Sequence, residues 1–150
     1  MIGFAKRQAV LLGVPATVLI ADDSEPIRSL LEMILSASGH TVVQVEDGRA
    51  VLVYLKDNTP DLMILDVTMP FIDGIEICGR VKRISRLKAT PVIILTAHTD
   101  EDSRRRALAA GADAFVNKPL AGKNLRQTIG DMLEKRETLL MKQTHVTLEE

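Results

Sequence analysis

A short apolar segment that ends on a carboxylate gives the first indication of the fold. Residues 62–65 form an uninterrupted apolar run, and Asp66 follows directly. Such a run is typical of a strand buried on both faces of a sheet, because both sides of the pleat must then be apolar. Met69-Pro70 and Asp73-Gly74 supply turn signals before the next helix. Since open α/β sheets bind ligands where strands end, Asp66 is either a site residue or a simple loop cap.

Short apolar runs alternate with segments of helical periodicity along the whole chain. The expected strands are residues 18–21, 41–45, 62–65, 92–96 and 114–116, and the expected helices begin near residues 24, 48, 74, 100 and 122. The third helix is expected to run from Gly74 to about Leu87, with Ile84 among the positions available to the core. The alternation predicts right-handed crossovers and a parallel sheet with helices on both faces.

The length of 150 residues suits one domain with extensions at both ends. We expect an N-terminal extension over residues 1–15, a folded domain over 16–135 and a C-terminal extension over 136–150. Residues 6–21 resemble a signal peptide, but Pro15 interrupts them and residues 17–21 are better explained as the first strand. The C-terminal extension, with Leu139 and Leu140, is either an interaction surface or a frayed helix end.

The composition argues against several classes of function. The 19 basic and 20 acidic residues give a net charge of −1, which offers no general attraction to nucleic acid or to an anionic membrane. Aromatic residues make up 3% of the chain, so few side chains could stack on bases. Cys78 is the single cysteine, which excludes an internal disulfide and is compatible with the reducing cytoplasm, the expected location. Its apolar neighbours indicate a packing role in the core.

Chemically reactive side chains follow four of the five expected strands. Asp22 and Asp23 follow the first, Asp66 the third, Thr96 ends the fourth and Lys118 follows the fifth. Because parallel strands end at the same edge of a sheet, we expect these side chains to lie together. Three carboxylates and one ammonium favour a divalent cation, and hard oxygen ligands favour Mg²⁺ over Zn²⁺. A phosphoryl group on Asp66, the expected nucleophile, would face this cation, Lys118 and Thr96.

With these residues the chain resembles the response regulator receiver domain of bacterial two-component signalling, over about residues 16 to 135. The motifs that carry the resemblance are Asp22-Asp23, Asp66 with Met69-Pro70 and Asp73-Gly74, Thr96-Ala97, Ala110-Gly111-Ala112 and Lys118-Pro119. The resemblance implies a flavodoxin-like (βα)5 fold, a doubly wound parallel sheet of five strands in the order 2-1-3-4-5. It also implies that a histidine kinase or phosphotransfer protein donates a phosphoryl group to Asp66.

The resemblance assigns a role to each residue around Asp66. Asp23, Asp66 and the backbone carbonyl of Thr68 would bind Mg²⁺ directly, with Mn²⁺ as a substitute. Asp22 would act largely through water, and Lys118 would pair with the phosphoryl group. The chain would not be an enzyme beyond its own phosphoryl acceptance and slow autodephosphorylation.

The resemblance further implies a switch. Thr96 would move toward the phosphoryl oxygen and Phe115 would turn inward, although Phe115 also suits a plain core role. The face formed by the fourth helix, fifth strand and fifth helix would then change its protein partners. Thr68 and His98 would tune the lifetime of the phosphoryl group, with an exposed loop position as the alternative for His98. The Lys118-Pro119 peptide is a candidate cis bond.

Three readings of function compete at this stage. The first is a stand-alone receiver that signals through protein contacts, as a monomer or a weak phosphorylation-dependent dimer, without direct nucleic-acid or membrane binding. The second is a receiver-like binding module that is not phosphorylated. The third is a phosphatase with an aspartyl nucleophile, but that class needs a second Asp where Thr68 stands. A dinucleotide-binding fold is disfavoured because no Gly-x-Gly-x-x-Gly follows the first strand.

Overall fold

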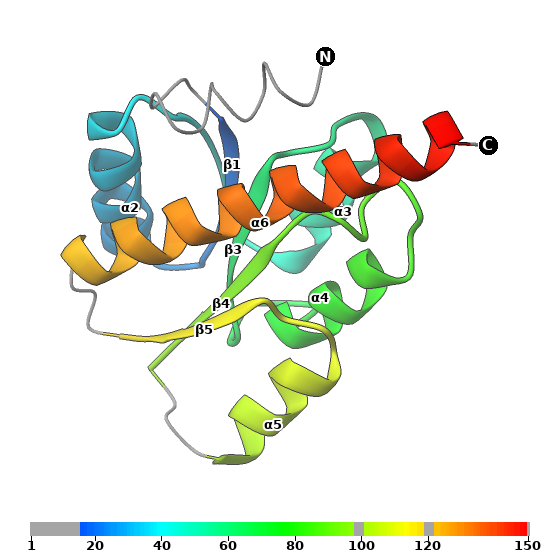
Figure 1. The fold of residues 1–150 in the computed structure, drawn as a ribbon. Coiled ribbons are helices and arrows are strands. Elements are labelled where there is room, and N and C mark those ends of the chain that lie inside the picture. The colour runs from blue at the N-terminus through cyan, green and yellow to red at the C-terminus, as the bar shows by residue number, and fades with distance from the viewer. Residues whose placement is uncertain (1–15, 98–100, 119–121, 150) are drawn as a thin grey trace.

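The computed structural model describes residues 16–97, 101–118 and 122–149, and five strands alternate with five helices within these residues (Figure 1). The strands are β1 (Thr17–Ala21), β2 (Thr41–Val45), β3 (Leu62–Asp66), β4 (Val92–Thr96) and β5 (Ala114–Asn117). The helices are α2 (Glu25–Ala37), α3 (Gly48–Asp57), α4 (Gly74–Lys82), α5 (Glu101–Ala109) and α6 (Gly122–Glu149).

The strands form one parallel sheet in the order β2-β1-β3-β4-β5. The pairing aligns Leu19 of β1 with Val43 of β2 on one side and with Met63 of β3 on the other. This order confirms the flavodoxin-like fold that the sequence predicts. The order of the strands reverses beside β1, so the carboxyl ends of β1 and β3 flank the position where such sheets bind ligands.

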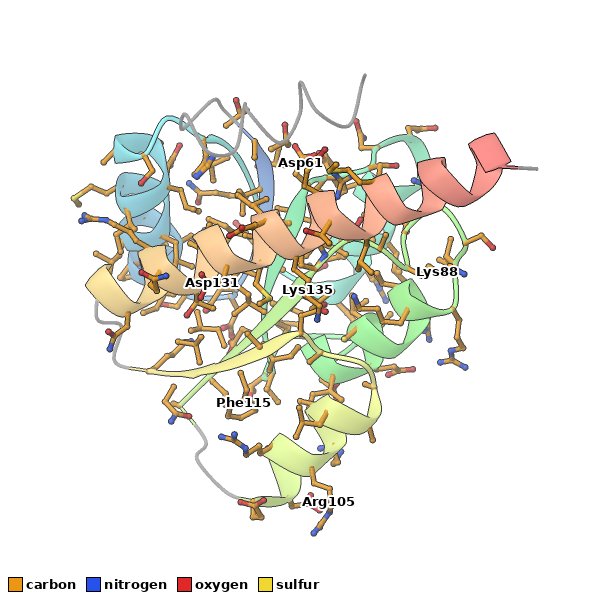
Figure 2. All side chains as sticks on the ribbon, viewed as in Figure 1. Asp61, Lys88, Arg105, Phe115, Asp131 and Lys135 are labelled. Carbon is orange, nitrogen blue, oxygen red and sulfur yellow. The ribbon has the colours of Figure 1, made fainter. Side chains whose placement is uncertain are left out.

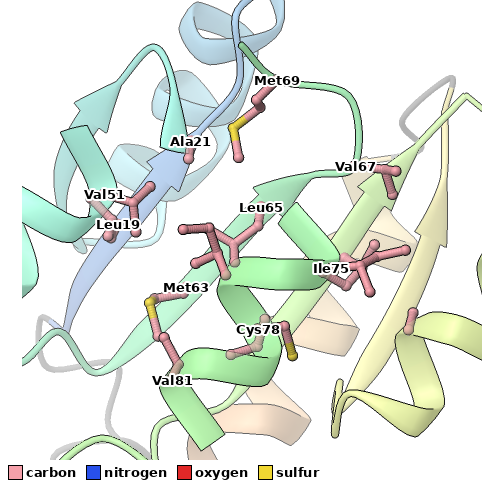
Figure 3. Close-up of a cluster of buried hydrophobic side chains, with 14 of the residues drawn as sticks. Leu19, Ala21, Val51, Met63, Leu65, Val67, Met69, Ile75, Cys78 and Val81 are labelled. Atoms are coloured by element: carbon pink, nitrogen blue, oxygen red, sulfur yellow. The ribbon is translucent and has the colours of Figure 1, made fainter. Parts of the chain in front are cut away.

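Two layers of helices bury the two faces of the sheet. Because successive side chains of a strand point to opposite faces, Leu19 and Met63 enter one core cluster and Ile20 and Ile64 enter the other. Helices α3, α4 and α5 cover the first cluster, which Figure 3 shows in close-up, and α2 and α6 cover the second. Cys78 is fully buried in the first cluster, as predicted.

Helix α4 ends at Lys82, five residues before the predicted end at Leu87. The N–H of Arg83 donates to the carbonyl oxygen of Arg80 and the N–H of Ile84 to that of Val81, each at 3.1 Å, and turns replace the helix beyond this point. The prediction for Ile84 was wrong, since this side chain is 42% exposed while Leu87 is fully buried. Because the chain leaves the helix after Lys82, Leu87 reaches the core and Ile84 does not.

Helix α6 runs without a break across the predicted boundary between residues 135 and 136 (Figure 1). Beyond that point Glu137 is 2% exposed, and Arg136 pairs with Asp61, near the start of β3, at 3.3 Å. Leu139 is 38% exposed.

Among the helices in the described part of the chain, none combines the length and the apolar composition needed to cross a membrane.

Asp113 joins α4 and α6 to the edge of the sheet at which β4 begins. Its carboxylate accepts bonds from Lys82 at 2.7 Å, from Lys135 at 2.9 Å and from the N–H of Val92 at 2.9 Å. Burial alone would raise the pKa of Asp113, but these bonds outweigh burial and hold the pKa below its usual value. The ionised carboxylate therefore stabilises the folded state.

Replacing Asp113 with alanine is expected to lower the free energy of unfolding by about 2 kcal/mol or more, because Lys82 then loses its carboxylate partner in a largely buried setting. Asp102→Ala is the control, because the Asp102–Arg105 pair is mostly exposed and should contribute less than about 1 kcal/mol. Urea unfolding at pH 7 measures both. Equal losses in the two variants would contradict the assigned role of Asp113.

Candidate functional site

Three carboxylates meet at the carboxyl ends of β1 and β3. Oxygen atoms of Asp22, Asp23 and Asp66 all lie within 4.8 Å of one another. Asp22 is fully buried and Asp66 is 6% exposed, while Asp23 is exposed to solvent. The sequence prediction that these three residues converge is confirmed, and the exposed Asp23 leaves the cluster open to ions from solution.

Lys118 adds a cation from the end of β5. Its Nζ donates to Oδ2 of Asp22 at 2.9 Å and lies 3.5 Å from Oδ1 of Asp66. The backbone N–H of Lys118 donates to the carbonyl oxygen of Thr96 at 2.8 Å, which fixes the end of β5 beside the end of β4. The four charged groups therefore form one cluster although they are far apart in the sequence.

The start of α2 holds Asp22 in place. Ser24 caps this helix by accepting a bond from the N–H of Ile27. The N–H of Ser24 in turn donates to Oδ1 of Asp22 at 2.9 Å. Both carboxylate oxygens of Asp22 thus accept a bond from the protein, one from Ser24 and one from Lys118.

The segment after β3 is packed tightly around Asp66. The N–H of Val67 bonds to the carbonyl oxygen of Leu95, and the N–H of Gly74 bonds to that of Val67, each at 3.1 Å. A Cβ on Gly74 would lie 2.9 Å from the carbonyl carbon of Asp66 and closer still to its oxygen. Asp73 caps α4 through the N–H of Glu76 at 2.8 Å. The Asp73-Gly74 pair therefore works as a helix cap followed by a close backbone approach.

Sequence reasoning missed Phe71, which lies in the same segment. Its φ of 73° is in the left-handed region, where a bulky side chain is uncommon. The ring is 64% exposed, and the guanidinium carbon of Arg49 lies 3.7 Å from the ring centroid. An aromatic residue directly after Met69-Pro70 was the available signal, but its backbone conformation could not be inferred from that pattern.

The charges of the cluster shift its protonation equilibria. Burial, reinforced by Asp22, raises the pKa of Asp66 from 3.8 to about 6, although Lys118 acts in the opposite direction. Burial alone would lower the pKa of Lys118, but its bonds to Asp22 and Asp66 outweigh burial and raise it. The metal-free cluster therefore carries an excess of negative charge that a bound cation would relieve.

The donor set suits a hard divalent cation. Asp22, Asp23 and Asp66 offer carboxylate oxygens alone, and an oxygen set with one solvent-exposed member fits Mg²⁺, which retains several of its waters. Neither thiol nor imidazole takes part in this three-residue cluster, which disfavours zinc. Thr68, whose carbonyl the sequence analysis adds to the set, lies two residues after Asp66 with an exposed side chain.

The remaining predicted residues fall into two groups. Thr96 is fully buried at the end of β4, and Phe115 is half-buried on β5, where it packs against the core cluster beneath α3, α4 and α5 (Figure 2). His98 and Pro119 lie outside the described residues, and so does the predicted cis peptide between Lys118 and Pro119. The roles predicted for these residues stay predictions.

Comparison with known proteins gives one consistent family. Residues 18–130 match the model of the response regulator receiver domain. The transcriptional regulatory protein AfsQ1 of Streptomyces coelicolor is 40% identical over 123 residues, which cover 82% of this chain and 53% of AfsQ1. The chain thus spans about half the length of the curated relatives it matches.

Solved structures show the same fold. The chemotaxis response regulator CheY4 of Vibrio cholerae is 32% identical with a TM-score of 0.73, covering 78% of this chain and 98% of CheY4. The receiver domain of a signal transduction histidine kinase from Syntrophus aciditrophicus is 35% identical with a TM-score of 0.75, covering 79% and 89% of the two chains. The chain described here belongs to the response regulator receiver domain family of two-component signalling.

Proposed function

We propose that this receiver accepts a phosphoryl group on Asp66 from a histidine kinase or a phosphotransfer protein. The observation that carries the proposal is the position of Asp66, which ends a fully buried strand and lies among two further carboxylates and the Lys118 ammonium. A lone carboxylate after a strand would need none of these neighbours. Acceptance of this kind is self-catalysed and makes the chain a signalling module, not a turnover enzyme.

The chemistry assigns each group a task. A carboxylate oxygen of Asp66 attacks the phosphorus atom of a phosphohistidine, and the bond from phosphorus to the histidine nitrogen breaks. A Mg²⁺ ion held by Asp23 and Asp66, with the Thr68 carbonyl, supplies charge neutralisation when bound. Lys118 donates a hydrogen bond to a phosphoryl oxygen, and Asp22 keeps Lys118 oriented through their 2.9 Å contact.

The proposed output is a change in the face formed by α5, β5 and α6. The Thr96 hydroxyl moves to the phosphoryl group, and Phe115 turns further inward on β5, so the contacts available on this face change. Downstream recognition then occurs by protein contact, with the chain as a monomer or as a weak phosphorylation-dependent dimer. The bond from the Lys118 N–H to the Thr96 carbonyl supports this coupling, because it joins the ends of β4 and β5.

Backbone NMR with beryllofluoride, a stable analogue of an aspartyl phosphate, tests the proposal. Addition of Mg²⁺ and beryllofluoride should shift the amide resonances of β5 and α5, whereas Asp66→Asn should show no such shifts. Shifts confined to the loops around the carboxylate cluster would contradict the switch. No response of the folded wild-type protein to either reagent would favour a binding module without phosphorylation.

The lifetime of the aspartyl phosphate is expected to depend on Thr68 and His98. Each is expected to flank the path of the attacking water, so Thr68→Ala and His98→Ala should change the dephosphorylation rate while Mg²⁺ affinity stays nearly constant. Decay of the phosphorylated protein, followed by intact mass, measures the rate in each variant. Equal rates in both variants and the wild type would refute the assignment.

A further inference from the structure

Arg28 of α2 is a buried cation with no role in the chemistry above. It is 9% exposed, and its Nη1 donates to the main-chain oxygen of Asp22 at 2.8 Å. Its Nε donates to Oε1 of Gln44 in β2 at 3.3 Å, and its Nη2 lies 3.7 Å from a carboxylate oxygen of Glu46. The guanidinium therefore connects the edge of the sheet to the peptide that joins Asp22 and Asp23.

The contacts of Asp22 show why this peptide matters. Its N–H donates to the carbonyl oxygen of Val45 at 3.3 Å, and its carboxylate oxygens accept from Ser24 and Lys118 at 2.9 Å each. Arg28 supplies the donor for the remaining polar group, the backbone carbonyl. Without Arg28, the peptide that joins Asp22 to Asp23 would lose this bond and could rotate. The exposed Asp23 carboxylate would then change its direction.

We propose that Arg28 is a positioning residue for the cation site. By holding the carbonyl of Asp22, it fixes the direction in which the Asp22 and Asp23 side chains leave the loop between β1 and α2. The inference rests on the proposed function, because it concerns the cation that these carboxylates and Asp66 would bind. Groups that orient metal ligands typically affect metal affinity by about 10- to 100-fold when they are removed.

The orientation of the guanidinium is itself fixed by a neighbouring amide. Gln44 accepts the Nε bond of Arg28 and donates its own amide N–H to the carboxylate of Glu32 on α2. A planar guanidinium can serve Asp22 and Gln44 at the same time, whereas a lysine ammonium cannot reproduce this fork. Charge alone therefore does not define the role of Arg28.

Electrostatics and positioning predict opposite effects on cation binding. Arg28→Met removes a positive charge near the carboxylate cluster, and electrostatics alone would then tighten Mg²⁺ binding. The positioning role predicts weaker binding, because the Asp22–Asp23 peptide loses its anchor. The sign of the change in Mg²⁺ affinity therefore separates the two effects.

Arg86 provides a matched control. Its guanidinium donates to the carbonyl oxygens of Leu55 and Asn58 at the C-terminal end of α3, the latter at 3.1 Å. Arg86→Met thus removes the same charge and the same type of bond. It does so near the start of β3, at the opposite end of the strands from the carboxylates. Both variants should lower the thermal unfolding midpoint, so a loss of stability alone does not support the proposal.

Isothermal titration calorimetry with Mg²⁺ tests the inference on the folded wild type and variants. We expect Arg28→Met to bind Mg²⁺ about 10-fold more weakly, Arg28→Lys to remain weakened although its charge is kept, and Arg86→Met to match the wild type. If Arg28→Met does not fold, Arg28→Lys decides the question. The proposal would be overturned if Arg28→Met, or Arg28→Lys where Arg28→Met does not fold, bound Mg²⁺ as tightly as the wild type or more tightly. Absence of Mg²⁺ binding in the wild type would instead overturn the proposed function itself.

Discussion

Gly74→Ala is expected to destabilise the protein by about 3 kcal/mol or more and to displace Asp66. The added methyl group would lie 2.9 Å from the carbonyl carbon of Asp66 and would also press on the side chain of Leu65. The obstacle at Asp66 is backbone, so no flexible side-chain end can move away to relieve the overlap. Asp66, the proposed phosphoacceptor, would itself have to shift, and Mg²⁺ affinity should fall together with stability.

Gly130→Ala is the control for this substitution. Nothing lies within 4 Å of a Cβ at Gly130, which is exposed on α6, so alanine should stabilise the helix by about 0.5 to 1 kcal/mol. Urea unfolding compares the two variants at pH 7. A Gly74→Ala protein as stable as the wild type would show that the segment after β3 can relax, contrary to the packing described here.

Asp66→Asn is expected to stabilise the metal-free protein at neutral pH. The pKa of Asp66 is raised from 3.8 to about 6, so the folded state binds a proton more tightly than the unfolded state does. Ionisation of Asp66 above this pKa therefore costs the folded state about 2 to 3 kcal/mol, and asparagine avoids the cost. Lys118 keeps a carboxylate partner in the variant, because its contact with Asp22 remains.

The pH dependence of this difference follows from the same shift. Below about pH 4 Asp66 is protonated in both states, so the two proteins should be almost equally stable. The stability of the wild type then falls relative to Asp66→Asn as the pH rises to about 6, and the difference stays constant above it. Thermal unfolding between pH 4 and 8 without divalent cations measures the difference. A difference that does not grow with pH would contradict the account.

Saturating Mg²⁺ should make the wild type more stable than Asp66→Asn at pH 7, the reverse of the order expected without the cation. A cation bound by the ionised carboxylates stabilises the wild type by mass action, and Asp66→Asn has lost one of the proposed ligands. Repeating the scans with Mg²⁺ separates the cost of the empty charged cluster from general effects of the substitution. An equal Mg²⁺ response in both proteins would place the cation elsewhere.

The sequence predicts the sheet and the cluster at its edge for a simple physical reason. Buried parallel strands must be apolar along their whole length, so an ionisable residue such as Asp66 stands out where a strand ends. Parallel topology then brings the strand ends together, and the separation between Asp22 and Lys118 in the sequence does not matter. The positions of these residues therefore followed from the pattern and the topology alone.

Features that depend on the reach of long side chains were not predictable in this way. Lys82, the last residue of α4, reaches Asp113, which is 31 residues away in the sequence. The contacts of Arg28 with Asp22 and Gln44 depend on how α2 packs on β2. In the sequence both basic residues resemble ordinary polar positions of a helix, because periodicity reports which side of a helix is apolar and not what a charged side chain reaches.

Intact mass spectrometry after incubation with Mg²⁺ and a low-molecular-weight acyl phosphate tests the central claim most directly. We predict that the wild type gains one phosphoryl group, about 80 Da, only when Mg²⁺ is present, and that Asp66→Asn gains none. Thr96→Ala and Lys118→Met, run in parallel, should accept less because each removes a proposed partner of the phosphoryl group. An adduct that forms equally in Asp66→Asn, or without Mg²⁺, would contradict the assignment of Asp66 as the phosphoacceptor in a cation-dependent site.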